Sequence, residues 1–177
     1  MFDAEPNVRA TEIDLEFLEH QLAGMEPAPP RRSAGEVFES QMLGRLQFVP
    51  MPLGRPSLWR GEQKMPDSRF ALQIVCEVDG DQVPGADQAA CVTAFRRLQV
   101  QDAMQCAPLI NVRLSELPDG RTISADDLVL TMVHLPPHPL TDARYELGFR
   151  ATSVPQLLFT VVFQRGVPSS VRIDSDH

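Results

Sequence analysis

Hydrophobic alternation over residues 70–78 is the feature of this sequence that most constrains its fold. Every second residue from Phe70 to Val78 is apolar, and mixed residues stand between them. Successive side chains of a β-strand point to opposite faces, so this pattern predicts a strand with one buried face. Further strand-type runs occur in the last third of the chain, at 128–135, 145–149, 157–163 and 167–173. The three residues 164–166 between the last two runs predict a hairpin loop.

The middle of the chain has the periodicity of helices. Asp87 precedes one apolar set that spans about three turns. A second set follows at spacings of three and four, with Pro108 inside it. Because the apolar phase survives across Pro108, we expect a kink, or a helix that restarts with Pro108 in its first turn. The two sets are Cys91, Val92, Phe95 and Leu98, and then Ala103, Ala107, Ile110, Leu114 and Leu117.

Two short extended runs, 46–49 and 57–60, precede the first long strand. Prolines and glycines stand between and around them, which predicts short strands joined by tight turns. Strands, a helical middle and then a run of strands are typical of an α+β protein. We therefore expect an α+β fold in which an antiparallel β-sheet packs against a central helical pair, with an N-terminal amphipathic helix.

The N-terminal segment differs from the rest. Thr11 and Asp14 predict a helix start, and apolar residues then recur at three- and four-residue spacing up to Met25. Glu12, Glu16 and Glu19 lie together on the opposite side of that helix. Three prolines follow within four positions and favour an extended linker. The expected parts are an acidic helical arm at 1–26, a Pro-rich linker at 27–35 and a single α+β domain at 36–177.

The formal net charge is −8, and the sequence pI is about 4.9. Binding to nucleic acid needs clustered lysine and arginine, so this charge argues against a nucleic-acid partner. It argues equally against an anionic membrane surface. Residues 1–40 hold nine of the 24 acidic residues and three of the 16 basic ones. A basic protein partner, reached through charge complementarity, is the expectation that follows.

Cysteine usage and the N-terminus indicate a reducing compartment. The three cysteines, Cys76, Cys91 and Cys106, are an odd number without CxxC spacing and stand among apolar neighbours. They are typical of small buried residues, not of a disulfide framework. No secretory signal pattern and no apolar run of about 18–20 residues occurs, so we expect a cytoplasmic protein.

No motif for catalysis, cofactor binding or metal binding is present. His134 and His138 have a four-residue spacing, but two prolines between them prevent the helix that would bring them together on zinc. No Gly-x-Ser-x-Gly nucleophile motif and no glycine-rich phosphate loop occurs. Asp79-Gly80-Asp81 lacks the later ligands of a calcium loop and is better explained as a turn. We therefore expect no catalytic, metal-binding or cofactor-binding residues, and no enzyme activity.

Candidate partner-binding residues follow from charge and from the single tryptophan. Trp59 next to Arg60 could anchor an interface, because interface hot spots favour both residue types. It could also belong to the core, where it would pin the small N-terminal sheet, and that is the interpretation we favour. Surface carboxylates could contact a basic partner. The expected partner-binding residues are Glu12, Glu16, Glu19, Trp59, Asp79 and Asp81.

The order of elements over residues 36–177 resembles a group of small bacterial α+β proteins that are often encoded beside polymorphic toxins and type VI secretion effectors. The resemblance is carried by Leu43-Gly44, by Trp59-Arg60-Gly61 and by the terminal strand-turn-strand at 159–174. The family often has a polar or acidic-His stretch before the final hairpin. Here the residues at 153–156 are Ser-Val-Pro-Gln, so a site built on that stretch is not expected.

The resemblance implies an immunity protein that binds and neutralises a cognate toxin in the cytoplasm. An acidic inhibitor of a basic toxin would gain association rate and specificity from its charge. The alternatives are a secretion chaperone or adaptor that recruits an effector, an unconventional hydrolase that uses the acidic turns, and a structural or regulatory component without a toxin.

Overall fold

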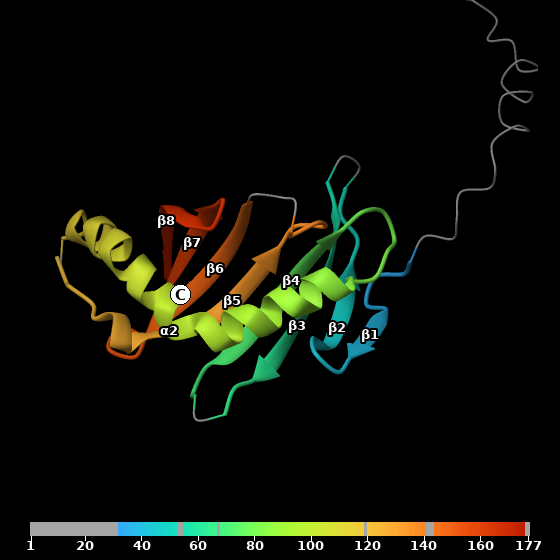
Figure 1. Ribbon diagram of the computed structural model, residues 1–177, viewed down its shortest axis with the longest axis horizontal. Helices are drawn as coiled ribbons and strands as arrows, with labels where there is room; N and C mark the ends of the chain where they lie inside the picture. The colour runs from blue at the N-terminus through green and yellow to red at the C-terminus, as the bar shows by residue number, and fades with distance from the viewer. Residues whose placement is uncertain (1–31, 53–54, 67, 119, 141–143, 176–177) are drawn as a thin grey trace, which may run out of the picture. The chain divides into compact units, whose positions relative to one another are not determined.

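Eight strands form one mixed β-sheet in the computed structural model of the protein, which describes residues 32–52, 55–66, 68–118, 120–140 and 144–175 (Figure 1). The strands stand side by side in chain order, from β1 at one edge to β8 at the other. Their bounds are Val37–Ser40 (β1), Gly44–Val49 (β2), Ser57–Lys64 (β3), Ala71–Val78 (β4), Leu128–Leu135 (β5), Arg144–Ala151 (β6), Leu157–Gln164 (β7) and Val167–Ser175 (β8). Between β4 and β5 the chain forms the long helix α2, Ala86–Ser115, and the 3-10 turn η1, Ala125–Asp127.

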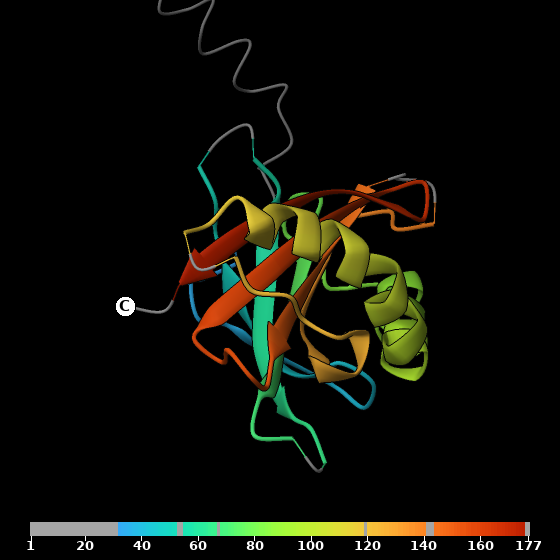
Figure 2. The same cartoon turned by 90° about the vertical axis from the view of Figure 1, so that its left-hand side faces the viewer.

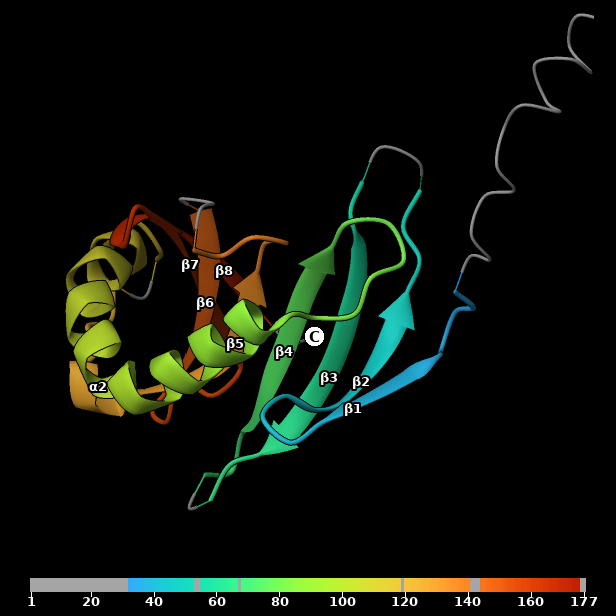
Figure 3. The same cartoon turned by 45° about the vertical axis from the view of Figure 1, so that its right-hand side comes forward.

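Strands β4 and β5 run parallel, and every other neighbouring pair in this sheet is antiparallel. Parallel neighbours cannot be joined by a tight turn and need a long connection, which α2 supplies here. The helix crosses one face of the sheet and contacts β5, β8 and η1 (Figures 1 and 3). The sheet is strongly twisted, so that the C-terminal strands run obliquely to β3 in Figure 2.

The strands expected from alternation and apolar runs are confirmed. In β4, Leu72 and Ile74 are buried on one face, and the residues between the buried positions are half-buried. The apolar run at 128–135 coincides with β5. The expected hairpin between β7 and β8 is confirmed as a two-residue turn, in which Arg165 and Gly166 both have positive φ, at 52° and 75°. That geometry suits the twist of the flanking strands.

The fold differs from the expected antiparallel sheet and helical pair in two respects. The sheet is mixed, because the long connection brings β5 alongside β4 in a parallel register. The two apolar sets belong to one helix of 30 residues, with Pro108 inside it. Figure 3 shows that this helix is bent. Proline interrupts one backbone hydrogen bond and bends a helix without necessarily ending it. The prediction of a pair was therefore wrong, and of the two expectations for Pro108 the structure shows a helix that continues through it.

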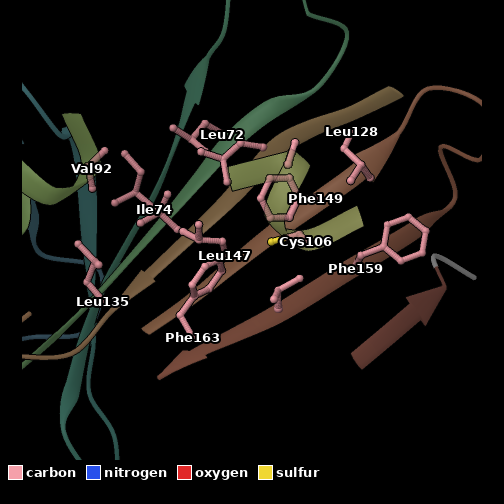
Figure 4. Packing of buried hydrophobic residues seen from close by; sticks show 14 of the residues in the cluster. Leu72, Ile74, Val92, Cys106, Leu128, Leu135, Leu147, Phe149, Phe159 and Phe163 are labelled. Atoms are coloured by element: carbon pink, nitrogen blue, oxygen red, sulfur yellow. The ribbon is translucent and has the colours of Figure 1, made fainter. Parts of the chain in front are cut away.

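The core lies between α2 and the sheet (Figure 4). It is built from buried side chains of β2 to β7 and of α2. An aromatic stack extends it, since Tyr145 on β6 lies between Phe95 on α2 and Phe163 on β7, with centroid distances of 5.0 and 4.9 Å. Labelled examples are Leu72, Ile74, Val92, Cys106, Leu128, Leu135, Leu147, Phe149, Phe159 and Phe163.

The predicted arm at 1–26 lies outside the described residues, and so does most of the predicted linker. The last linker residues are described and contact the sheet. Gly35, with φ +81°, donates its N–H to the carbonyl oxygen of Phe48 at 2.9 Å. Contacts place the start of the described unit at Arg32. No helix within the described ranges is long and apolar enough to cross a membrane.

Candidate functional site

One buried side chain of α2 holds the ends of β4 and β5 together. Gln88 is 2% exposed, and its Nε2 donates to the carbonyl oxygens of Glu77 at 2.8 Å and Pro136 at 2.9 Å. Its Oε1 accepts the N–H of Gly85 at 3.1 Å, which also caps the first turn of the helix. In sheets with parallel strands, ligands tend to bind outside the carboxyl ends of those strands. This end of the sheet is therefore the first candidate for a binding site.

Two acid–histidine pairs stand at these strand ends. Glu77 Oε1 lies 2.9 Å from His134 Nε2, and both side chains are just over a quarter exposed. Asp79 Oδ2 lies 3.0 Å from His138 Nε2, in a pair that is well exposed. Each pair joins the β4 side to the β5 side, so both depend on the parallel register. The first pair is shielded from water and contributes more electrostatically than the second.

A second carboxylate completes the environment of His134. Glu146 on β6 is its direct partner in the antiparallel register, with Oε2 3.8 Å from Nδ1. That distance is too long for a hydrogen bond, so Glu146 acts on His134 as a neighbouring charge. Glu146 raises the pKa of His134 most, partial burial opposes the rise, and Glu77 adds to it. In return His134 lowers the pKa of Glu146. The geometry therefore favours an imidazolium between two carboxylates.

Two hollows adjoin these pairs. The larger, of about 720 Å³, is lined by Glu77, His134 and Glu146, and also by Arg144 and Arg165. Two carboxylates and two guanidinium groups therefore line this hollow, and their formal charges cancel.

The smaller hollow, of about 250 Å³, is lined by Asp79, Asp87 and His138 beside the first turn of α2. No lysine or arginine occurs among its described lining residues. We call this smaller hollow the acidic notch. Its size suits one side chain better than a larger ligand.

These groups can exchange protons and can accept hydrogen bonds. Imidazole is the side chain whose charge changes closest to neutral pH. Asp79 and Asp87 can accept N–H donors from a lysine or arginine of a partner, and such charge-assisted bonds are the stronger ones. Tyr145, which lines the larger hollow, has its pKa raised to about 12 by burial and keeps its proton at neutral pH.

Trp59 belongs to the core, which is one of the two interpretations left open by its sequence context. Its side chain is 0% exposed, and its Nε1 donates to the carbonyl oxygen of Gln82 at 2.7 Å. The rings of Phe48 and Phe38 pack against it at centroid distances of 5.3 and 5.7 Å. The guanidinium of Arg32 covers its ring at 5.4 Å. In this conformation the ring has no surface for a partner.

The other predicted partner-binding residues lie in different places. Asp79 lines the acidic notch. Asp81 accepts the backbone N–H of Arg32 at 3.3 Å, and its carbonyl oxygen accepts Arg32 Nε at 2.5 Å. Asp81 therefore attaches the start of the described unit to the turn after β4. The acidic residues of the predicted arm, Glu12, Glu16 and Glu19, lie outside the described residues.

Sequence reasoning missed the network around His134. Glu77, His134 and Glu146 come from three strands, and Glu77 and His134 are 57 residues apart in the chain. A signal was nevertheless present. His134 stands in a mostly apolar run, and Glu77 and Glu146 stand on the polar positions of alternating strands. Pairing the strands in the correct order would have been needed to bring the three together.

Among the described residues, no group of three or more His, Cys, Asp or Glu side chains is arranged to hold a metal ion. Comparisons of the chain with protein-family models, with curated proteins and with solved structures give no match. The resemblance to toxin-associated bacterial proteins stays a prediction, and a functional proposal has to rest on the residues of this chain.

Proposed function

We propose that this chain is a non-enzymatic protein-binding protein, most specifically a cytoplasmic immunity protein that neutralises a cognate bacterial toxin. The toxin has a basic surface, and recognition begins with electrostatic attraction. Such attraction raises the association rate and selects against partners of the wrong charge.

The distribution of charge along the chain carries this proposal. Residues 32–177, which make up the folded unit, contain 17 acidic and 14 basic side chains, a net charge of −3. Residues 1–31 contain seven acidic and two basic side chains. The excess negative charge is therefore concentrated in the segment that also has the sequence pattern of an amphipathic helix. A folded unit of small net charge joined to a strongly acidic segment suits the capture of a basic protein.

The acidic notch supports the same proposal within the folded unit. Asp79 has a side chain that is 59% exposed, and Asp87 is exposed in the first turn of α2. A lysine or arginine of the partner can enter the notch and contact both carboxylates. Because Gln88 holds the strand ends that frame the notch, its shape is preorganised for binding.

Co-expression with the product of the adjacent gene tests the proposal. We expect the chain to restore growth of a bacterial host that expresses this protein, and to form a complex with it that survives size-exclusion chromatography. Failure of both growth rescue and complex formation contradicts the proposal. A stable complex without growth rescue would instead indicate a chaperone or adaptor for a secreted effector.

Charge-reversal variants test whether the acidic arm, and not the rest of the chain, steers association. Changing Glu12, Glu16 and Glu19 together to lysine should reduce the association rate constant at low salt by about tenfold or more and weaken its salt dependence. A matched control reverses three exposed acidic residues of the folded unit, Glu39→Lys, Glu62→Lys and Asp126→Lys, with the same change in net charge. Equal effects of the two triple variants would show that net charge matters and that the arm does not steer binding.

A further inference from the structure

A third hollow, of about 730 Å³, lies on another part of the molecule and combines arginines with apolar side chains. Met65 and Phe70 line it from the connection between β3 and β4, and Val129 lines it from β5. Arg69 stands next to Phe70, and Arg96 projects from α2. The described lining residues include no aspartate or glutamate; Asp67, which precedes Ser68 in the chain, lies outside the described residues.

Arg69 is held in place by neutral groups. Its Nη2 donates to the carbonyl oxygen of Thr152 at 2.5 Å, and its guanidinium lies 4.9 Å from the ring centroid of Phe70. It forms no ion pair with a carboxylate of the described residues. A guanidinium has five N–H donors, so donors remain for a ligand after the bond to Thr152.

Arg96, on α2, is likewise held by a neutral group. Its Nη1 donates to the amide oxygen Oε1 of Gln63 at 3.2 Å, which orients the side chain without neutralising it. Within the described part of the chain it too forms no ion pair. Neither guanidinium group forms an ion pair among the described residues, although Arg69 also lines a neighbouring hollow with Glu62. The two groups create a local positive potential that an anion would neutralise.

We propose that this hollow binds a small amphipathic carboxylate, a molecule with one carboxylate group and an apolar body. The carboxylate accepts N–H donors from Arg69 and Arg96, which match its planar geometry. The apolar body lies against Met65, Phe70 and Val129. A volume of about 730 Å³ falls in the range of small-molecule sites, which combine apolar walls with a few convergent polar groups. The site is separate from the acidic notch and does not depend on the proposed toxin partner.

Titration of the isotopically labelled full chain with 3-phenylpropionate, followed by NMR chemical shifts, tests this site. We expect saturable shifts at Phe70, Arg96 and Val129, with a Kd on the order of 1 mM for a ligand of this size. The neutral analogue 3-phenylpropan-1-ol should bind about tenfold more weakly, and acetate should give no saturable shift up to about 10 mM.

Variants decide whether the arginines carry the binding. Arg69→Gln with Arg96→Gln should weaken 3-phenylpropionate by about tenfold or more, whereas Arg97→Gln, an exposed arginine outside the lining, should leave it unchanged. If the double variant does not fold, each single variant is measured, and each should weaken binding several-fold. Equal affinity for the acid and the alcohol overturns the proposal. The proposal is also overturned if the arginine variants bind 3-phenylpropionate as the wild type does, or if 3-phenylpropionate gives no saturable shift up to about 10 mM.

Discussion

Glu77 and His134 form a 2.9 Å contact across the parallel strand pair β4–β5, although 57 residues separate them in the chain. Glu146 approaches the same imidazole from β6 at 3.8 Å. Together the two contacts depend on the register of β4, β5 and β6. The ion pairs of His134 are the best shielded among those between described residues.

The His134 network should make stability depend on pH. The pKa of His134 is raised in the folded state, so its stabilisation is fully present below the unfolded value, about 6.5, and is lost as pH rises through the folded value. The pKa of Glu146 is lowered, so its contribution is present above its unfolded value, about 4.3, and is lost as pH falls through the folded value. Both contributions are therefore present between about pH 5 and 6.5.

Urea unfolding of the wild type and of His134→Gln checks this. We expect the variant to be about 1 kcal/mol less stable at pH 5.5 and the difference to shrink at pH 8.5. His138→Gln, in the exposed pair with Asp79, serves as the control and should change stability by less than about 0.5 kcal/mol. A difference between wild type and His134→Gln that is the same at both pH values would contradict the assigned network.

Trp59 should behave as a core residue. It is the single tryptophan of the chain, so its fluorescence reports on one site. We expect blue-shifted emission that iodide quenches only after unfolding, because the side chain is 0% exposed. Trp59→Phe removes the hydrogen bond to Gln82 and part of the packing volume, and should lower the free energy of unfolding by about 2 kcal/mol. Native emission at the wavelength of exposed tryptophan would rule out this placement.

Gly61 should be intolerant of a larger residue. A Cβ at this position would lie 2.3 Å from the carbonyl oxygen of Arg45 on β2, so the backbone of the strand pair would have to separate. We expect Gly61→Ala to reduce the free energy of unfolding by about 1–3 kcal/mol in denaturant titration. Gly85→Ala is the control, since no atom lies within 4 Å of its added Cβ, and the loss there should stay below about 1 kcal/mol. Similar losses in the two variants would show that close strand approach does not explain Gly61.

The cysteines should differ in reactivity toward a thiol reagent. Burial raises the pKa of Cys76 and of Cys106 to about 12, so neither forms appreciable thiolate at neutral pH. Cys91 is half-buried, and its pKa is raised, first by burial and then by the charge of Asp87. We expect Cys91 to react first and slowly in the native protein, and all three cysteines to react rapidly in denaturant. Cys91→Ser should remove the native phase, and a rapid native reaction that persists in this variant would contradict the assigned burial.

Strand positions were predictable because alternation is a local property. The pattern at 70–78 identifies β4, and the apolar run at 128–135 identifies β5, without knowledge of their neighbours. The hairpin at Arg165 and Gly166 was likewise predictable, because a two-residue turn acts only on its own flanks. The resemblance motif Trp59-Arg60-Gly61 acquires a structural explanation: Trp59 fills the core, and Gly61 allows β2 to approach β3.

The sequence by itself thus determined seven of the eight strand segments, all but β1, and where the helical middle lies, since both depend on neighbours within a few residues. Only the tertiary structure decided that α2 continues through Pro108, that β4 and β5 are parallel, and that Glu77, His134 and Glu146 meet. The reason is physical. Whether a helix survives a proline depends on the packing of the turns on either side of it. The register between distant strands is selected by burial of their common apolar face. That face is formed by residues far apart in the chain, so no short window of sequence contains all of them.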